Sequence, residues 1–234
     1  MKDIFFLDYY ESYADEHWEI LSSRFPIAKR IGGIKGLKQA HTECARQSTT
    51  NYFYVVDADA AITSNFDFSF SPCETKEAYP GVLETECVHI FHSRNPVNGL
   101  EYGYGAVKLF PRHQFLSNNV TEYVDMTTSL QLPIVVHPII SNITYFNSDP
   151  FNTWRSAFRE CVKLSSSIIQ NQINTETAQR LKIWQTVGNG NHGSYSIQGA
   201  KDGTEYGSTF KSEPDKLSLI NDFDWLKEKF QAVK

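Results

Sequence analysis

The sequence contains few of the residues that build disulfide frameworks and zinc sites. Only 4 of its 234 residues are cysteine. Cys44, Cys73, Cys87 and Cys161 form no Cys-x-x-Cys pair and match no zinc-ligand spacing, which excludes a disulfide scaffold as the source of stability. We expect all four thiols to be reduced and buried.

Long apolar runs are also missing, which excludes a membrane-spanning helix of about 20 apolar residues. The first three residues lead directly into a short apolar stretch, without the charged and apolar regions of a signal peptide. We therefore expect a cytosolic protein with no membrane partner.

The chain lacks an excess of positive charge, since its formal net charge is −5. Such a chain has no general attraction to nucleic acid, so a polyanion would have to meet a local patch. The stretch 24–46 offers one, because it holds six basic residues against one acid, Glu43. The six are Arg24, Lys29, Arg30, Lys35, Lys38 and Arg46. Some of these would contact a diphosphate, and the others would form a solvated helix face.

What the sequence does contain is a core-forming composition and one conspicuous stretch. Hydrophobic residues make up 41% and aromatic residues 14% of the chain, enough for the core of one domain. In the stretch 52–62, a run of β-forming residues (Tyr52–Val56) ends in two acids, Asp57 and Asp59. A continuous apolar run of this kind is typical of a strand covered on both faces, inside a mostly parallel sheet flanked by helices.

The two acids are candidate metal ligands. Ligands gather where parallel strands end, and Mg²⁺ or Mn²⁺ is commonly held by one or two carboxylates together with water and substrate phosphates. Asp57 and Asp59 would share one face of a continuing strand, and a bend could converge them on one cation. The alternative is an Asp-rich turn with no ligand, which is common for an isolated Asp-x-Asp.

The segment Tyr54–Asp59, preceded by a helical pattern over 33–47, resembles the Asp-x-Asp segment of the GT-A nucleotide-sugar glycosyltransferases. Three further segments, 103–111, 151–164 and 199–203, resemble the phage-borne TET-associated glycosyltransferases and the related 5-hydroxymethylcytosine arabinosyltransferases. The resemblance implies a single Rossmann-like GT-A domain, with a nucleotide-binding half at 1–65 and an acceptor-binding half at 80–234. The protein would then act in the host cytoplasm if a phage encodes it.

This resemblance implies a nucleotide sugar, expected to be a uridine diphosphate donor carrying arabinose or glucose, and a hydroxyl acceptor in modified DNA. Asp8 and Tyr9 end the first apolar stretch and are candidate contacts to the base, although Asp8 would equally suit the start of a turn. Arg30 and Lys38 are implied as contacts to the donor diphosphate. GT-A enzymes commonly return a late histidine to the metal, and His192 is best placed for that role; an imidazole suits Mn²⁺ better than Mg²⁺.

Inverting transfer would need a carboxylate to take the acceptor proton. Asp149, just before a long amphipathic helix, is the first candidate and Glu160 the second, although Glu160 also suits a helical ion pair with Lys163. On that helix Arg155, Arg159 and Lys163 share one face. This face would be either a solvated surface or a track for a DNA backbone.

Other segments carry structural expectations. Strands are expected at 82–92 and 103–110, and in the second of these Gly103 and Gly105 would either let a ligand approach the backbone or mark a β-bulge. Helices are expected at 14–23, 152–170, 175–185 and 222–231. The glycine-dense stretch 188–207 would be a loop over a ligand or a flexible connector. His41 falls on an apolar stripe, so we expect it to be packed in the core.

Two other functions fit the paired acids. A nucleotidyltransferase also uses carboxylates and a metal, but it usually begins with a glycine-rich phosphate loop, which residues 8–13 lack. A binding module for sugar nucleotides or nucleic acid would use the Asp-x-Asp only as a turn. Titration with Mn²⁺ and a panel of nucleotide sugars, followed by thermal stability, would discriminate between these functions, because ligands that bind the native state raise its stability.

Overall fold

The computed structural model describes residues 1–104, 106–117, 124–169 and 172–232. The chain divides into two compact units, one formed by Met1–Arg94 with Glu101–Tyr145 and the other by Asn95–Leu100 with Phe146–Lys234. The expected nucleotide-binding half at 1–65 and acceptor-binding half at 80–234 are defined by function and stay predictions.

The first unit is built on a mixed sheet with the strand order β2-β1-β3-β9-β7-β10-β4, in which β8 also pairs with β7. Five of these strands run in one direction and β9, β8 and β4 run against them, which confirms the expected mostly parallel α/β sheet. The strands are β1 (Asp3–Asp8), β2 (Lys29–Gly32), β3 (Tyr52–Asp57), β4 (Ala60–Ile62), β7 (Val88–Arg94), β8 (Glu101–Tyr102), β9 (Val107–Pro111) and β10 (Ile134–Thr144).

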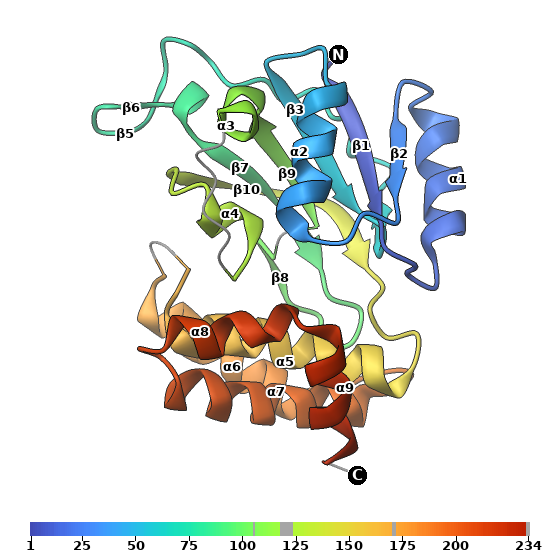
Figure 1. Cartoon of the computed structure of the whole chain (residues 1–234), viewed down its shortest axis with the longest axis vertical. Helices are drawn as coiled ribbons and strands as arrows, with labels where there is room; N and C mark the ends of the chain where they lie inside the picture. The colour runs from blue at the N-terminus through green and yellow to red at the C-terminus, as the bar shows by residue number, and fades with distance from the viewer. Residues whose placement is uncertain (105, 118–123, 170–171, 233–234) are drawn as a thin grey trace. The chain divides into compact units, whose positions relative to one another are not determined.

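Helices cover both faces of this sheet, as its apolar strands require. In β1, Ile4 and Phe6 face a core shared with Leu21 of α1 (Ala14–Arg24). Phe5, between them, faces the opposite core, shared with Cys44 of α2 (Leu37–Gln47). Figure 1 shows α2 lying across β1 and β3. The alternation of side chains along the strand therefore supplies a core on each side.

The sheet curls so strongly that its far edge returns to the end of β3. Asp57 closes β3 and Ala60 opens β4, yet three strands lie between β3 and β4 in the sheet order. Three residues of extended chain reach about 10 Å, whereas four strand spacings in a flat sheet span about 19 Å. Curling removes this mismatch and places Asp57 and Asp59 in a tight connection between two strands.

Smaller elements complete the first unit. A hairpin of β5 (Glu77–Tyr79) and β6 (Val82–Leu83) forms a separate two-stranded sheet, followed by a 3₁₀ turn at Glu84–Glu86. Two short helices, α3 (Arg112–Leu116) and α4 (Met126–Ser129), follow β9. The strand expected at 82–92 is therefore wrong in part, because the turn at 84–86 interrupts it before β7.

The strand expected at 103–110 begins only at Val107. Gly103 precedes it, and Gly105 lies outside the described residues. Of the four thiols, Cys73 is exposed, so the expectation that all four are buried is wrong for this one.

The second unit is helical in its described part. Its helices are α5 (Pro150–Ser166), α6 (Asn174–Thr186), α7 (Gly193–Thr209), α8 (Pro214–Ser218) and α9 (Phe223–Gln231). The expected helices at 152–170, 175–185 and 222–231 correspond to α5, α6 and α9, and the expected end of the first, Gln170, lies outside the described residues. Within the described residues, no helix is both long enough and apolar enough to cross a membrane.

The expectation of a loop or connector at 188–207 is wrong from Gly193 onward. Gly199, Gly203 and Gly207 recur every four residues on one face of α7. A Cβ added at Gly199 would lie 2.2 Å from the carbonyl oxygen of Trp154, and one at Gly203 would lie 2.3 Å from that of Phe158. These glycines are therefore the contact surface of a helix packed directly on the backbone of α5.

Candidate active site

The carboxyl ends of β1, β2 and β3 meet at one edge of the sheet and bring several acids together. In the parallel register Leu7 lies beside Asp57, and Asp8 lies beside Gly32 of β2. We call the acidic side chains at this place, Asp8, Glu11, Asp57 and Asp59, the acid edge. It is the location at which ligands bind in open α/β sheets.

Asp57 is half-exposed and forms an ion pair with a lysine of the neighbouring strand. Nζ of Lys108 on β9 lies 3.0 Å from Oδ2 of Asp57, and the backbone N–H of Asp57 donates to the carbonyl of Ala106 over 2.9 Å. The Lys108 side chain is 13% exposed and that of Asp57 is 39% exposed. Lys108 was not singled out from the sequence, because only the pairing of β3 with β9 brings it to the acids.

Asp59 is half-buried in a connection whose backbone is held on both sides. The backbone N–H of Tyr145 donates to the Asp59 carbonyl over 2.7 Å, and Nδ1 of His17 bonds the Ala58 carbonyl over 2.8 Å. The rings of Tyr13, His17 and Tyr145 pack on one another with centroids 5.6 to 6.1 Å apart. This aromatic group fixes the connection that presents Asp59.

Asp8 and Arg30 are joined more tightly than the sequence suggested. Nε of Arg30 donates to Oδ2 of Asp8 over 3.0 Å, Nη2 also bonds that oxygen, and Nη1 contacts Asp15 over 2.6 Å. Burial raises the pKa of Asp8, but the hydrogen bonds from Arg30 and from the N–H of Tyr10 outweigh it and lower the pKa overall. Arg30, the expected diphosphate contact, thus already serves two carboxylates.

Glu11 is an acid of this edge that sequence reasoning missed. Its Oε2 accepts the N–H of Tyr9 over 2.6 Å. Burial raises the pKa of Glu11, and the negative charges of Asp8 and Asp57 raise it further despite that hydrogen bond. A second acid three residues after Asp8, in the turn that follows the first strand, was the available signal. Tyr9 itself is 46% exposed and so accessible to a ligand.

Most of the basic stretch 24–46 has structural partners. Arg24 donates to four carbonyls at the end of β4 and in the segment after it, Lys29 bonds the Gln47 carbonyl, and Arg46 pairs with Glu43. No hydrogen bond or ion pair joins Lys35 or Lys38 to another described residue. Among the described basic residues of 24–46, Lys35 and Lys38 are therefore the ones available to contact an anionic ligand.

Lys35 and Lys38 flank the amino terminus of α2. The helix is capped by Gly36 with a φ of 102° and without a side-chain cap, so its first N–H groups have no side-chain acceptor there. Such N–H groups and the helix dipole favour an anion. The loop also follows β2, whose Gly32 lies beside Asp8 in the sheet.

The two acids of the Asp-x-Asp are suitable ligands for a divalent metal ion. Asp57 and Asp59 offer hard carboxylate oxygens in one short connection, which suits Mg²⁺ or Mn²⁺ completed by water and phosphate oxygens. Among the described residues, no group of three or more His, Cys, Asp or Glu side chains is arranged to hold a metal by itself. His192 belongs to the second unit, where it precedes α7 with a φ of 62°, and its metal role stays a prediction.

The two expected bases carry structural roles in the second unit. Asp149 caps α5, since its Oδ1 accepts the N–H of Asn152 over 2.9 Å and Oδ2 accepts the hydroxyl of Ser148 over 3.1 Å. Burial raises the pKa of Asp149, but these hydrogen bonds prevail and lower it. Glu160 is buried and lies 2.8 Å from Nζ of Lys163, which confirms the expected helical ion pair.

The basic residues of α5 are also engaged within their unit. The Arg155 guanidinium lies 4.6 Å from the centroid of the Phe223 ring, and Nη2 of Arg159 donates to Oδ1 of Asn221 over 2.9 Å. Lys163 pairs with Glu160. All three side chains are partly buried, which differs from the fully solvated face considered from the sequence.

Gly103 is explained by packing. A Cβ at this position would lie 2.7 Å from Cγ1 of Val136 on β10, so glycine allows the chain to pass over that strand. A role of Gly103 and Gly105 in acceptor binding stays a prediction.

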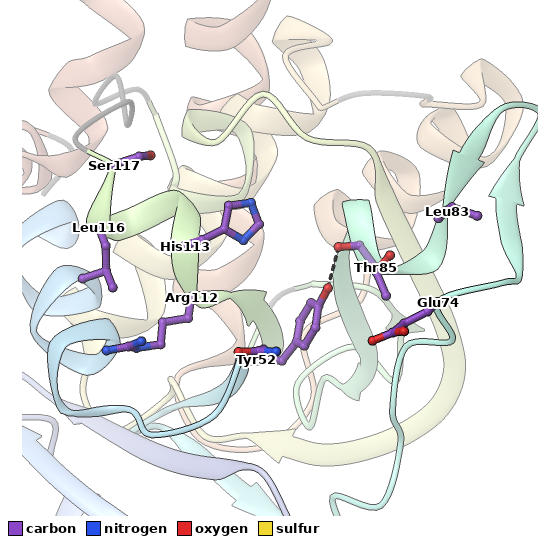
Figure 2. Close-up of a pocket in the computed structure, with 9 residues that line it drawn as sticks. Tyr52, Glu74, Leu83, Thr85, Arg112, His113, Leu116 and Ser117 are labelled. Atoms are coloured by element: carbon purple, nitrogen blue, oxygen red, sulfur yellow. Dashed lines mark hydrogen bonds between the residues drawn. The ribbon is translucent and has the colours of Figure 1, made fainter.

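A cavity of about 690 Å³ lies at the amino end of β3, the end opposite to the acids (Figure 2). It is lined by Asn51, Tyr52, Glu74, Leu83, Thr85, Arg112, His113, Leu116 and Ser117. The hydroxyl of Tyr52 donates to the Thr85 carbonyl over 2.6 Å at its wall. None of the expected site residues lines this cavity.

The chain matches no family model and no curated protein. Among solved structures it is similar to residues 1–349 of S. aureus TarS, at 11% identity and a TM-score of 0.40, with 100% of this chain and 92% of that chain covered. It is also similar to the mannosyltransferase PcManGT from Pyrobaculum calidifontis in complex with GDP-Man and Mn²⁺, at 11% identity and a TM-score of 0.43, with 95% and 88% covered. Both TM-scores lie below 0.5.

Proposed function

We propose that this protein is a metal-dependent glycosyltransferase of the GT-A type, which moves a sugar from a nucleoside diphosphate to a hydroxyl acceptor. The observation that carries the proposal is the acid edge. Asp57 and Asp59 stand in a fixed connection at the carboxyl end of β3, and β1 and β2 end at the same edge. A turn without a ligand explains neither the braced backbone of Ala58 and Asp59 nor the crowding of four acids.

In this proposal Asp59, assisted by Asp57, holds the divalent ion. The ion, when bound, stabilises the negative charge that develops on the leaving diphosphate. If His192 is a further ligand, His192→Ala should weaken Mn²⁺ affinity about 10-fold or more. Even the loss of a residue that only hydrogen-bonds to a metal ligand has an effect of this size. An unchanged Mn²⁺ titration would remove His192 from the site.

The nucleotide occupies the edge formed by β1 and β2. Lys35 and Lys38, with the uncapped N–H groups of α2, would receive the diphosphate, because Arg30 is held by Asp8 and Asp15. Tyr9 offers an exposed ring to the base. We propose a uridine diphosphate sugar as the donor, with arabinose and glucose as the sugars to be tested first.

For the acceptor we propose 5-hydroxymethylcytosine in DNA, on the resemblance of the segments 103–111, 151–164 and 199–203. A second candidate acceptor is a hydroxyl of a glycan or protein. The contacts of the basic residues of α5 favour this candidate. Arg155, Arg159 and Lys163 already have partners inside their own unit, which leaves them less able to follow a phosphate backbone. Asp149 and Glu160 remain the bases proposed for an inverting reaction.

The experiment is transfer of labelled sugar, with Mn²⁺, to hydroxymethylated DNA, unmodified DNA, and glycan and protein acceptors. Label on hydroxymethylated DNA alone supports the first acceptor, and label on a glycan or protein supports the second. Asp59→Asn is the matched control for metal-dependent chemistry. The proposed function would be contradicted if no acceptor is labelled, the donor is not hydrolysed, and nucleotide sugars do not change the thermal stability.

If DNA is the acceptor, its binding should depend on salt through the phosphates that the protein neutralises. Replacing Arg155, Arg159 and Lys163 by Ala would then lower the slope of log affinity against log salt by about one unit for each phosphate that is no longer neutralised. Donor hydrolysis should survive that change. An unaltered slope would remove the α5 cations from the DNA path.

A further inference from the structure

The ion pair between Lys108 and Asp57 is built into the sheet. Lys108 lies opposite Val55 in the antiparallel pairing of β3 and β9. Residues 55 and 57 point to the same face of β3, so the Lys108 side chain reaches diagonally to Asp57. The resulting Nζ to Oδ2 distance is 3.0 Å.

The burial of the lysine explains why this pair forms. Only 13% of the Lys108 side chain is exposed, whereas Asp57 is 39% exposed. A buried ammonium without an anionic partner is strongly unfavourable, so Asp57 is the group that allows Lys108 to occupy this position. One oxygen of the first acid of the Asp-x-Asp is therefore occupied by a cation that belongs to the protein.

We propose that Lys108 is a built-in counterion that makes metal binding at the acid edge depend on the nucleotide. This inference rests on the proposed function and names a regulation of the same site. Lys108 offsets the negative charge of Asp57, so the acids hold a divalent ion alone more weakly than they would without this lysine. The diphosphate adds negative charge beside the ion and thereby favours the uptake of metal and donor together.

Joint binding of metal and donor would also give the Lys108 ammonium a second anionic partner. A divalent ion held by Asp57 would compete with the Lys108 ammonium for that carboxylate, and the diphosphate oxygens of the donor would then offer the ammonium other anionic partners. Lys108 is thus a positioning residue, acting first through Asp57 and then through the donor.

The test is the affinity for Mn²⁺, measured by electron paramagnetic resonance and calorimetry with and without uridine diphosphate. In Lys108→Met, we expect affinity for Mn²⁺ alone to rise about 10-fold, since removing one unit charge a few ångströms away changes binding at least that much at moderate salt. The increase in Mn²⁺ affinity caused by uridine diphosphate should shrink by a similar factor. Lys108→Arg should keep both values close to those of the unmodified protein.

Lys76→Met is the control, because Lys76 forms an ion pair with another carboxylate of the first unit, Glu84, at 2.6 Å. It should leave Mn²⁺ binding unchanged. If Lys108→Met does not fold, Lys108→Gln keeps a hydrogen-bond donor for Asp57 while removing the charge, and the same result is expected.

Two outcomes separate this inference from the proposed function. In the first outcome, the affinity for Mn²⁺ alone stays the same or falls in Lys108→Met and Lys108→Gln, while Asp59→Asn abolishes it. This result overturns the counterion role and does not contradict the proposed glycosyltransferase. An unmodified protein that binds no Mn²⁺, with or without uridine diphosphate, overturns both.

Discussion

Gly203 of α7 lies so close to Phe158 of α5 that a Cβ at Gly203 would stand 2.3 Å from the Phe158 carbonyl oxygen. A Cβ added at Gly199 would lie 2.2 Å from the Trp154 carbonyl oxygen, and one at Gly207 would lie 2.2 Å from Oγ of Ser165 and 2.6 Å from the Val162 carbonyl oxygen. At Gly199 and Gly203 the nearest atoms belong to the α5 backbone, which moves less readily than a side chain. The spacing of the two helices is therefore set by these glycines.

From this close approach we predict that Gly203→Ala destabilises the protein by about 1–3 kcal/mol, the usual cost of forcing an extra carbon into a packed core. The better helix propensity of alanine, worth about 1 kcal/mol, offsets part of that cost. Urea unfolding measures the difference. Glu205→Ala, at an exposed position of the same helix, is the control and should change stability little. Equal stability of the two variants would show that α5 and α7 can separate without cost.

Asp59→Asn should abolish sugar transfer while the unfolding midpoint stays nearly unchanged. The amide keeps the shape of the side chain but removes the negative charge that a divalent ion requires. Labelled transfer and thermal unfolding measure the two effects on the same sample. Retained turnover that still requires a metal would place the metal elsewhere.

Two variants of Asp149 distinguish a role in helix capping from a role in proton transfer. Asn is as good a cap as Asp, so Asp149→Asn should keep the stability of α5, whereas Asp149→Ala should lose about 0.5–2 kcal/mol. If Asp149 is the base, both variants lose transfer. Activity that survives in Asp149→Asn and falls only with the stability of Asp149→Ala would assign this residue to capping alone. The hydrogen bonds that lower its pKa favour that second result.

Two buried histidines predict acid sensitivity. Burial, together with the positive charge of Lys108, lowers the pKa of His41 to about 4, against the opposing effect of Asp57 and Asp125. Burial also lowers the pKa of His89 to about 4, with His137 and Lys2 acting in the same direction and Glu84 against it. In the unfolded chain both titrate near 6.5. The unfolded state therefore binds more protons between these values, so stability present above pH 6.5 is lost as the pH falls toward 4.

Each histidine contributes at most about 3.4 kcal/mol to this loss, at 1.36 kcal/mol per pKa unit. The measurement is the urea midpoint between pH 8 and pH 4. His41→Phe keeps an aromatic ring against Phe110 and Phe115 and should flatten the pH dependence. An identical slope in this variant would show that His41 is not protonated on unfolding.

The sequence by itself determined the elements that depend on local pattern. The apolar run before Asp57 predicted β3, because a strand covered on both faces has to be apolar throughout. The stripe of Trp154, Phe158 and Cys161 predicted α5, since helical periodicity is written in consecutive residues. His41 was expected in the core and is buried there for the same reason.

Only the tertiary structure decided which charges are available and which glycines are helical. Lys108 meets Asp57, and Arg30 meets Asp8 and Asp15, through strand pairing and packing that join residues up to 51 positions apart. Gly199 and Gly203 suggest a loop by propensity, because glycine is a poor helix former in isolation. In α7 this cost is offset by close packing on α5, which brings together residues about 45 positions apart and which no local pattern contains.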